Sequence, residues 1–205
     1  MTDNRLRGLY AITGQHRGDR LLSDVEQALR AGLRLLQYRN KSGDPDQQRT
    51  ETQRLRALCD RYHATLIIND DAALAAAIGA DGVHLGRNDG DIAAARRLLG
   101  PQALIGVSCY NDPQRARQAQ RQGADYIAFG SFYPSPTKPD AARAEPKLLE
   151  TWRTQPTPAC AIGGITLDNA PRLIQSGASM IAVISSLWRS GDIAKAAASF
   201  RSLFE

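Results

Sequence analysis

Residues 79–85 run Gly79-Ala80-Asp81-Gly82-Val83-His84-Leu85, and a glycine and an alanine placed in the same way before a short apolar run return at residues 123–129 and 177–183. Ala31-Gly32-Leu33 is a fainter copy. Glycine supplies the left-handed residue that ends a helix, and the small residue after it permits a tight turn into a buried strand. The repeated turn therefore predicts a repeated helix–strand unit.

Short apolar, β-branched runs alternate with stretches of helical period along the whole chain, which is the pattern of βα units. Helix starts are expected at Ser23-Asp24-Val25-Glu26, which has the form of a capping box, and near Asp112-Pro113 and Asp168-Asn169. Eight strands are expected, at residues 8–13, 35–38, 66–69, 82–85, 104–108, 126–129, 159–162 and 180–184.

Eight such units predict an α/β fold, a single (βα)₈ TIM barrel formed by residues 1–205. The competing fold is an open, doubly wound parallel sheet. That fold typically carries a glycine-rich first turn, whereas here the first strand runs into Thr13-Gly14-Gln15-His16 without a G-x-G-x-x-G pattern. The barrel is therefore favoured.

Composition limits the cellular setting. With 205 residues, 42% of them hydrophobic, the chain can bury one sizeable core. No apolar run approaches the roughly 20 residues that span a bilayer. Cys59, Cys109 and Cys160 are odd in number and widely separated, so neither a disulfide framework nor a zinc site is indicated. We expect a cytoplasmic protein with no membrane partner.

The chain is basic, with a formal charge of +5 and a pI near 9.4. Clustered cations would suggest a nucleic-acid partner. Arginine is instead spread over amphipathic segments such as residues 49–61 and 115–121, without interleaved aromatic residues. This pattern favours solvated helix faces and no nucleic-acid partner. A basic surface equally favours small anionic substrates.

Functional residues of such a barrel gather where strands end and the following loops begin. After the second strand, Gln37, Arg39 and Lys41 alternate, so an amide and two cations can face one way, which suits a diphosphate. Incidental charge at an exposed strand end is the alternative interpretation.

Each of the next two strands brings a carboxylate to the same rim. Asp70 and Asp89 could together hold Mg²⁺, which binds one or two carboxylates plus phosphate oxygens of the substrate. Helix N-capping is the alternative role for carboxylates at such positions, above all for Asp71 and Asp91. His84 falls inside its strand and is predicted to be a packed or locally hydrogen-bonded histidine rather than a catalytic base.

The remaining strands end in groups suited to anions. Ser108 lacks the strained turn of a serine nucleophile and is expected to donate a hydrogen bond to an anion. The longest loop, residues 130–145, contains Ser135-Pro136-Thr137-Lys138 and is predicted to be a lid or binding loop. Backbone N–H groups after the last two strands, near Gly163-Gly164, predict a second anion site. The result is one pocket with two anion sites, only one of them beside a metal.

Taken in order, these segments resemble the thiamine phosphate synthase family over nearly the full length of the chain. The resemblance rests on Leu9-Tyr10-Ala11-Ile12-Thr13, Gln37-x-Arg39-x-Lys41, Asn69-Asp70, Gly82-Val83-His84-Leu85-Gly86 followed by Asp89, Gly106-Val107-Ser108, Ser135-Pro136-Thr137-Lys138, Ala161-Ile162-Gly163-Gly164-Ile165 and Val183-Ile184-Ser185.

The resemblance implies that hydroxymethylpyrimidine diphosphate and hydroxyethylthiazole phosphate are joined to give thiamine phosphate. The implied mechanism is dissociative: diphosphate leaves before the thiazole nitrogen attacks. The two small molecules are the expected partners, Mg²⁺ is the expected cofactor, and a homo-oligomer is compatible with the sequence. By position, Gln37, Arg39, Lys41, Asn69, Ser108 and Lys138 would hold the diphosphate substrate, Asp70 and Asp89 would hold the metal, and Ser135, Thr137, Gly164, Ile184 and Ser185 would hold the thiazole phosphate, with Tyr38, Asn40 and Pro136 adjoining these groups as further substrate-binding positions.

Arg39, Lys41, Ser108 and Lys138 are the catalytic residues that the resemblance implies. The sequence departs from the commoner forms of the family at Asn40, Asp71, Arg87 and Ser135, where Glu, Arg, Gln and Thr are usual. Two rivals remain: an isomerase resembling the thiazole tautomerases, disfavoured because Tyr110 stands where they carry histidine, and a non-catalytic phosphate-binding relative, disfavoured because both aspartates are present.

Overall fold

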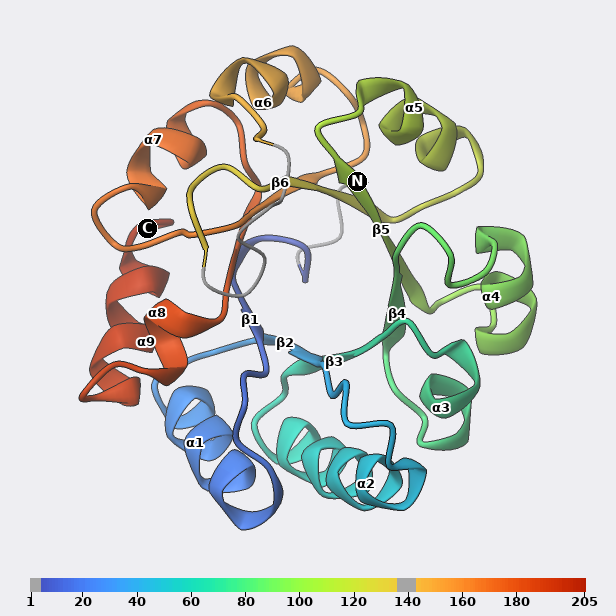
Figure 1. Cartoon of the computed structure of the whole chain (residues 1–205), viewed down its shortest axis with the longest axis vertical. Helices are drawn as coiled ribbons and strands as arrows, with labels where there is room; N and C mark the ends of the chain where they lie inside the picture. The colour runs from blue at the N-terminus through green and yellow to red at the C-terminus, as the bar shows by residue number, and fades with distance from the viewer. Residues whose placement is uncertain (1–4, 136–142) are drawn as a thin grey trace.

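A closed barrel of parallel strands, paired in the order β1 to β8 and back to β1, forms the centre of the computed structural model, which describes residues 5–135 and 143–205 (Figure 1). The predicted (βα)₈ barrel is confirmed, and the expected strand bounds are right to within two residues. The strands are β1 (Gly8–Ile12), β2 (Leu35–Tyr38), β3 (Thr65–Asn69), β4 (Gly82–Leu85), β5 (Leu104–Tyr110), β6 (Tyr126–Gly130), β7 (Ala159–Ile162) and β8 (Met180–Val183).

Side chains alternate between the two surfaces of each strand. In β1, Leu9 and Ala11 pack in the layer between strands and helices, whereas Tyr10 and Ile12 belong to a separate cluster inside the barrel. Both surfaces are buried, which explains why the strands appear in the sequence as continuous apolar runs.

Helices form the outer ring (Figure 1). None of the described helices is both long enough and apolar enough to cross a membrane. The helices are α1 (Gly18–Arg30), α2 (Pro45–Arg61), α3 (Ala72–Ala77), α4 (Ile92–Leu99), α5 (Pro113–Arg121), α6 (Pro146–Trp152), α7 (Ala170–Gln175), α8 (Ser185–Trp188) and α9 (Ile193–Ser202).

Five aspartates of the described residues begin helices by accepting hydrogen bonds from free backbone N–H groups, and three of them are Asp71, Asp91 and Asp112. Asp71 accepts from Leu74 at the start of α3, Asp91 caps α4, and Asp112 caps α5 just before Pro113. Capping, the alternative role weighed for Asp71 and Asp91, is therefore confirmed.

The capping box expected at residues 23–26 is wrong. Helix α1 begins at Gly18, and Asp24 lies within it, buried, with Oδ2 2.5 Å from His16 Nδ1. Gly18 has a φ of +55°, a left-handed conformation that lets the chain enter the helix six residues earlier than the motif indicates. The apolar period supports this start, because Leu21 and Leu22 are already buried.

The repeated glycine turns are confirmed, since Gly32, Gly79, Gly123 and Gly177 all have positive φ. They precede β2, β4, β6 and β8, so the repeating unit of the turn is a pair of βα units. In two copies the residue that follows the alanine has a further role. Asp81 accepts from Leu66 N and Arg56, and Asp125 accepts from Ile105 N and Arg96, at 2.6–2.7 Å.

Candidate active site

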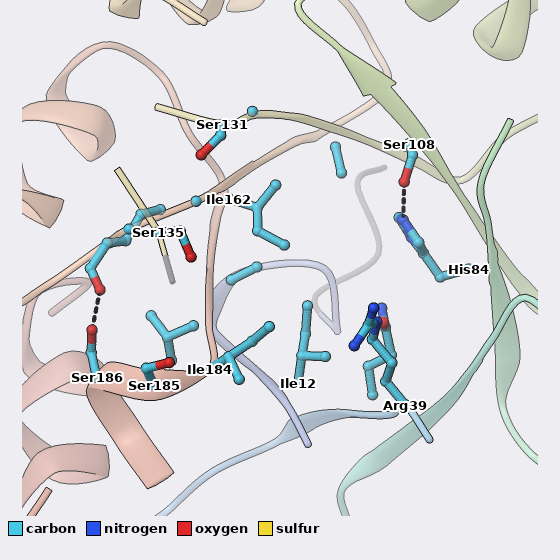
Figure 2. A pocket seen from close by; sticks show the side chains of 18 of the residues that line it. Ile12, Arg39, His84, Ser108, Ser131, Ser135, Ile162, Ile184, Ser185 and Ser186 are labelled. Carbon is cyan, nitrogen blue, oxygen red and sulfur yellow. Dashed lines mark hydrogen bonds between the residues drawn. The ribbon is translucent and has the colours of Figure 1, made fainter. Parts of the chain in front are cut away.

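A cavity of about 640 Å³ opens at the carboxyl ends of the strands. Figure 2 shows its polar side chains in two groups, with Arg39, His84 and Ser108 on one side and Ser131, Ser135, Ser185 and Ser186 on the other. Ile12, Ile162 and Ile184 lie between them. The lining comprises Ile12, Gln37, Arg39, Asn69, His84, Ser108, Tyr110, Ala128, Gly130, Ser131, Pro134, Ser135, Ile162, Gly163, Gly164, Ile165, Thr166, Ala182, Val183, Ile184, Ser185 and Ser186.

Arg39 enters the cavity from the end of β2. Its backbone is held on both sides by Thr13, whose Oγ1 accepts from Arg39 N at 2.8 Å and donates to Arg39 O at 3.1 Å. Gln37 is buried on the same side of the strand, and Asn69 at the end of β3 also faces the cavity. The structure thus brings together three of the groups predicted for the diphosphate substrate.

Tyr38 and Asn40 lie on the opposite side of the chain from Arg39, toward α2. The Tyr38 hydroxyl donates to Glu51 Oε2 at 2.7 Å, and Asn40 Nδ2 lies 3.3 Å from the same oxygen. The buried Glu51 also accepts from Gly18 N at 2.7 Å. Neither predicted substrate-binding side chain lines the cavity. They instead anchor the loop that carries Arg39 and Lys41.

Asp70, Asp89 and Lys41 form a cluster beside the cavity. Lys41 Nζ contacts Asp70 Oδ2, and Asp89 Oδ2 accepts from Gly86 N at 2.9 Å. Burial and the neighbouring Asp70 raise the pKa of Asp89. Burial acts to raise the pKa of Asp70 too, but hydrogen bonds from Lys41 and Asp89 outweigh it, and that pKa lies below its ordinary value. When both carboxyl groups are ionised they repel each other, and a bound cation would relieve that repulsion.

The pair fits Mg²⁺, which needs one or two carboxylates when substrate phosphates and water complete its shell. A side chain at Gly86 would collide with Asp89 Oδ2, so glycine there keeps the pair accessible. Asp70 has a φ of +66°, which turns it out of the strand direction that Asn69 follows. Within the described ranges, no three His, Cys, Asp or Glu side chains are grouped to hold a metal unaided.

Ser108 and Gly86 are held by a residue outside the cavity. Arg115, on α5, donates from Nε to Ser108 O at 2.7 Å and from Nη2 to Gly86 O at 3.0 Å. One guanidinium therefore sets the ends of β4 and β5 relative to each other.

On the other side of the cavity, backbone and hydroxyl groups predominate. Gly163 and Gly164 have φ values of +108° and +62°, and added side chains would collide with Ser131 and with Pro134 O. Glycine is thus needed there so that residues 131–134 can pack closely on the end of β7. The hydroxyl of Ser186 donates to Ile165 O, which ties the end of β8 to the end of β7 (Figure 2).

Comparison with known proteins gives one consistent result. The family model described as thiamine monophosphate synthase matches residues 9–187. A thiamine-phosphate synthase of Azoarcus sp. (strain BH72) is 52% identical over 202 residues, 98% of each chain. Another, of Methylobacillus flagellatus, is 52% identical over 200 residues, covering 97% of this chain and 96% of the relative.

The chain belongs to the thiamine monophosphate synthase family. Among solved structures, a thiamine phosphate pyrophosphorylase from Pyrococcus furiosus superposes with a TM-score of 0.86 at 32% identity, covering 98% of this chain and 96% of the other. One from Bacteroides thetaiotaomicron, at 17% identity and a TM-score of 0.70, covers 96% of each chain and supports the fold alone.

Within this thiamine monophosphate synthase barrel, most of the predicted residues that the structure describes lie in the cavity or beside it. Gln37, Arg39, Asn69, Ser108, Ser135, Gly164, Ile184 and Ser185 line the cavity, and Lys41, Asp70 and Asp89 form the cluster beside it. Pro136, Thr137 and Lys138 lie outside the described residues. The assignment of each role stays a prediction.

Sequence reasoning missed Tyr10, Tyr126, Glu51 and Arg115. None of the four lines the cavity. Tyr10, Tyr126 and Arg115 contact residues that do, whereas Glu51 holds the loop that carries Arg39 through Tyr38 and Asn40. Only Tyr126 left a signal in the sequence. Its partner in the sheet is Gly106, where any side chain would collide with the tyrosine ring, so a glycine within a strand indicated a close approach.

Proposed function

We propose that this protein joins hydroxymethylpyrimidine diphosphate to hydroxyethylthiazole phosphate, giving thiamine phosphate and diphosphate. The observation that carries the proposal is the division of one cavity. A cationic side beside a carboxylate pair suits a leaving diphosphate, and a side of hydroxyl and backbone groups suits a phosphate that stays.

The cationic side would hold the pyrimidine diphosphate. Arg39 and Lys41 would neutralise the charge that grows on the diphosphate as the carbon–oxygen bond breaks. Lys138, from the loop after β6, would add a third cation. Gln37, Asn69 and Ser108 would fix the substrate by hydrogen bonds, with Tyr38 and Asn40 holding their loop in place.

Asp70 and Asp89 would hold Mg²⁺. Bound there, the ion would supply positive charge beside the leaving group. Lys41, in contact with Asp70, would then face both the metal ligand and the diphosphate.

The reaction would need no base from the protein. The electron pair of the broken bond leaves with the diphosphate, and the lone pair of the thiazole nitrogen forms the new carbon–nitrogen bond. That nitrogen carries no proton to be removed. The cavity therefore acts by charge stabilisation and by positioning two rings against each other.

The opposite side would hold the thiazole phosphate. Ser135, Pro136 and Thr137 would cover the phosphate from the loop after β6, and Gly164, Ile184 and Ser185 would bind it from the ends of β7 and β8. Lined by side chains of three isoleucines, the middle of the cavity would accept the uncharged parts of both rings.

The proposal includes the setting of the reaction. The protein would work in the cytoplasm on small molecules, without a nucleic-acid or membrane partner, and a homo-oligomer is compatible with it. Cys59, Cys109 and Cys160 are free thiols, which is compatible with a reducing compartment.

Purified protein supplied with both substrates and Mg²⁺ should form thiamine phosphate and diphosphate in equal amounts. Asp70→Ala should lower the rate by about 100-fold or more, because the leaving charge loses its metal. Asp71→Ala is the matched control. It removes the neighbouring carboxylate, which caps α3, and should cost stability rather than turnover.

Other results of this assay would favour a different function or overturn part of the proposal. Rearrangement of a thiazole phosphate without the pyrimidine substrate would favour an isomerase. Phosphate binding with no product would favour a non-catalytic relative. A rate independent of Mg²⁺, or full activity in Asp70→Ala, would overturn the metal assignment.

A further inference from the structure

Five polar side chains form a continuous hydrogen-bonded chain across the inside of the barrel. Gln37 Nε2 lies 2.7 Å from Tyr10 Oη, which lies 2.7 Å from Tyr126 Oη. Tyr126 Oη is 3.1 Å from His84 Nδ1, and His84 Nε2 is 2.9 Å from Ser108 Oγ, as Figure 2 shows for this last link. Gln37 and Ser108, at the two ends, both line the cavity.

The middle of this chain is built into the barrel. Tyr10 and Tyr126 are at most 1% exposed, and their rings meet edge to face with centroids 5.8 Å apart. The ring of Tyr126 crosses the backbone of β5 at Gly106 and stacks on His84 at 5.5 Å. Strands β1, β4, β5 and β6 thereby pack around two phenol groups that do not line the cavity themselves.

The donors and acceptors of the chain can be assigned one after another. Burial raises the pKa of Tyr10 and of Tyr126, so each phenol keeps its single proton. Tyr10 Oη accepts from the Gln37 amide and therefore donates to Tyr126. Tyr126 must then donate to His84 Nδ1, which places the imidazole proton on Nε2, where it points to Ser108 Oγ.

The direction of these hydrogen bonds determines which groups Ser108 and Gln37 offer to the cavity. Because Ser108 Oγ accepts from His84, its own proton is available to a molecule in the cavity. Because Gln37 uses its amide nitrogen on Tyr10, its carbonyl oxygen is left to accept. The side of the cavity proposed for the pyrimidine substrate thus presents a donor at Ser108 and an acceptor at Gln37.

We infer that Tyr10, Tyr126 and His84 are positioning residues that fix the donor at Ser108 and the acceptor at Gln37 as one unit. This inference rests on the proposed function, in which both ends hold the pyrimidine substrate. The pyrimidine ring of the proposed product, thiamine phosphate, carries an amino group, which donates, and ring nitrogens, which accept, so it matches this pair of groups. Removing any link of this hydrogen-bonded chain lets the side chains of Ser108 and Gln37 rotate. The protein should then bind the pyrimidine substrate more weakly, while its affinity for the thiazole phosphate stays the same.

The direction of the chain can be tested without any reaction. Nitrogen-15 NMR of the intact protein should show His84 neutral, with its proton on Nε2, at neutral pH. Tyr126→Phe should convert this into a mixture of tautomers, and His84→Gln assigns the signal among three histidines. A proton on Nδ1 in the unsubstituted protein would overturn the inference.

The functional consequence is tested by steady-state kinetics. Tyr10→Phe and Tyr126→Phe should each raise the KM for the pyrimidine diphosphate by about 10-fold, with the KM for the thiazole phosphate unchanged. The KM for the pyrimidine diphosphate should rise no further in the double variant than in either single variant, because removing one hydroxyl already frees both ends. The inference would be contradicted if the two increases in KM multiplied in the double variant, or if the KM values of both substrates rose equally.

Tyr62→Phe is the matched control, since it removes a hydroxyl that donates to Glu26 at 2.9 Å on the outer helices. It should leave both KM values within about twofold. Thermal unfolding identifies any variant that fails to fold, and the NMR measurement on the unsubstituted protein still decides the inference in that event. If the unsubstituted protein makes no thiamine phosphate, the proposed function fails while the proton arrangement remains decided by NMR.

Discussion

At the scale of single residues, Asp89 shows how a residue placed to bind a metal can lower the stability of the metal-free protein. Burial and Asp70 raise the pKa of Asp89, so ionising Asp89 costs more in the folded protein than in the unfolded chain. The stabilising effect of this carboxyl is full below the ordinary Asp pKa and is lost as pH rises through its raised pKa. At neutral pH, the repulsion between the ionised Asp70 and Asp89 therefore lowers the free energy of unfolding of the metal-free protein.

Asp89→Asn should raise the free energy of unfolding of the metal-free protein at neutral pH by up to about 1 kcal/mol, a few degrees in Tm, after allowance for solvent screening. The gain should fade at acid pH, where Asp89 is already protonated. Thermal unfolding in a chelator at both pH values checks this. Asp91→Ala, in the same loop, removes the cap of α4 and should lower Tm instead. A lower Tm for Asp89→Asn at neutral pH would contradict the account.

The two aspartates also show how far sequence reasoning reaches at this scale. Their place after neighbouring parallel strands was enough to bring them together, because strand ends of a barrel share one rim. Alternation likewise placed Gln37 and Arg39 on one side. Tyr38 and Asn40 depended on Glu51, 13 and 11 residues away along the chain, and no local pattern announces such a partner.

At the scale of elements, α5 sets the geometry of two strand ends through Arg115. Its guanidinium donates to Ser108 O and Gly86 O, and Gly86 N in turn binds Asp89. Lysine carries the charge but cannot hold two carbonyls in a fixed fork. Arg115→Lys should therefore lower kcat/KM by about 10-fold, with a higher Mg²⁺ requirement.

Measuring the rate of Arg115→Lys as a function of Mg²⁺ concentration distinguishes a displaced metal site from a general loss of helix packing. Arg117→Lys, an exposed position on the same helix, is the control and should leave the rate and the Mg²⁺ requirement unchanged. Equal behaviour of the two variants would mean that α5 does not position the site.

Elements were the most predictable level of the structure. Apolar runs located every strand because both strand surfaces are buried, and glycine marked the helix ends that need positive φ. The start of α1 was missed because Ser23 and Glu26 imitate a cap inside a helix that Gly18 begins. Arg115 was equally hidden, since an arginine on a polar helix resembles any solvated one.

At the scale of the whole molecule, the barrel separates stability from function between its two ends. The cavity occupies the carboxyl ends of the strands, while the glycine turns that enter β4 and β6 occupy the opposite ends. There Asp81 and Asp125 each join a strand N–H group to an arginine of an outer helix. Such ties connect layers of the barrel without touching the cavity.

Asp125→Ala should thus lower the free energy of unfolding by about 1–3 kcal/mol, because it leaves Ile105 N and the partly buried Arg96 without their carboxylate. The folded fraction should keep its kcat, since no cavity residue moves. Asp19→Ala provides the comparison. Its ion pair with Arg54 is 89% exposed on the aspartate side and should contribute less than about 0.5 kcal/mol. Denaturant unfolding together with kinetics at low temperature tests both, and a fall in kcat for Asp125→Ala at unchanged stability would refute the separation of the two ends.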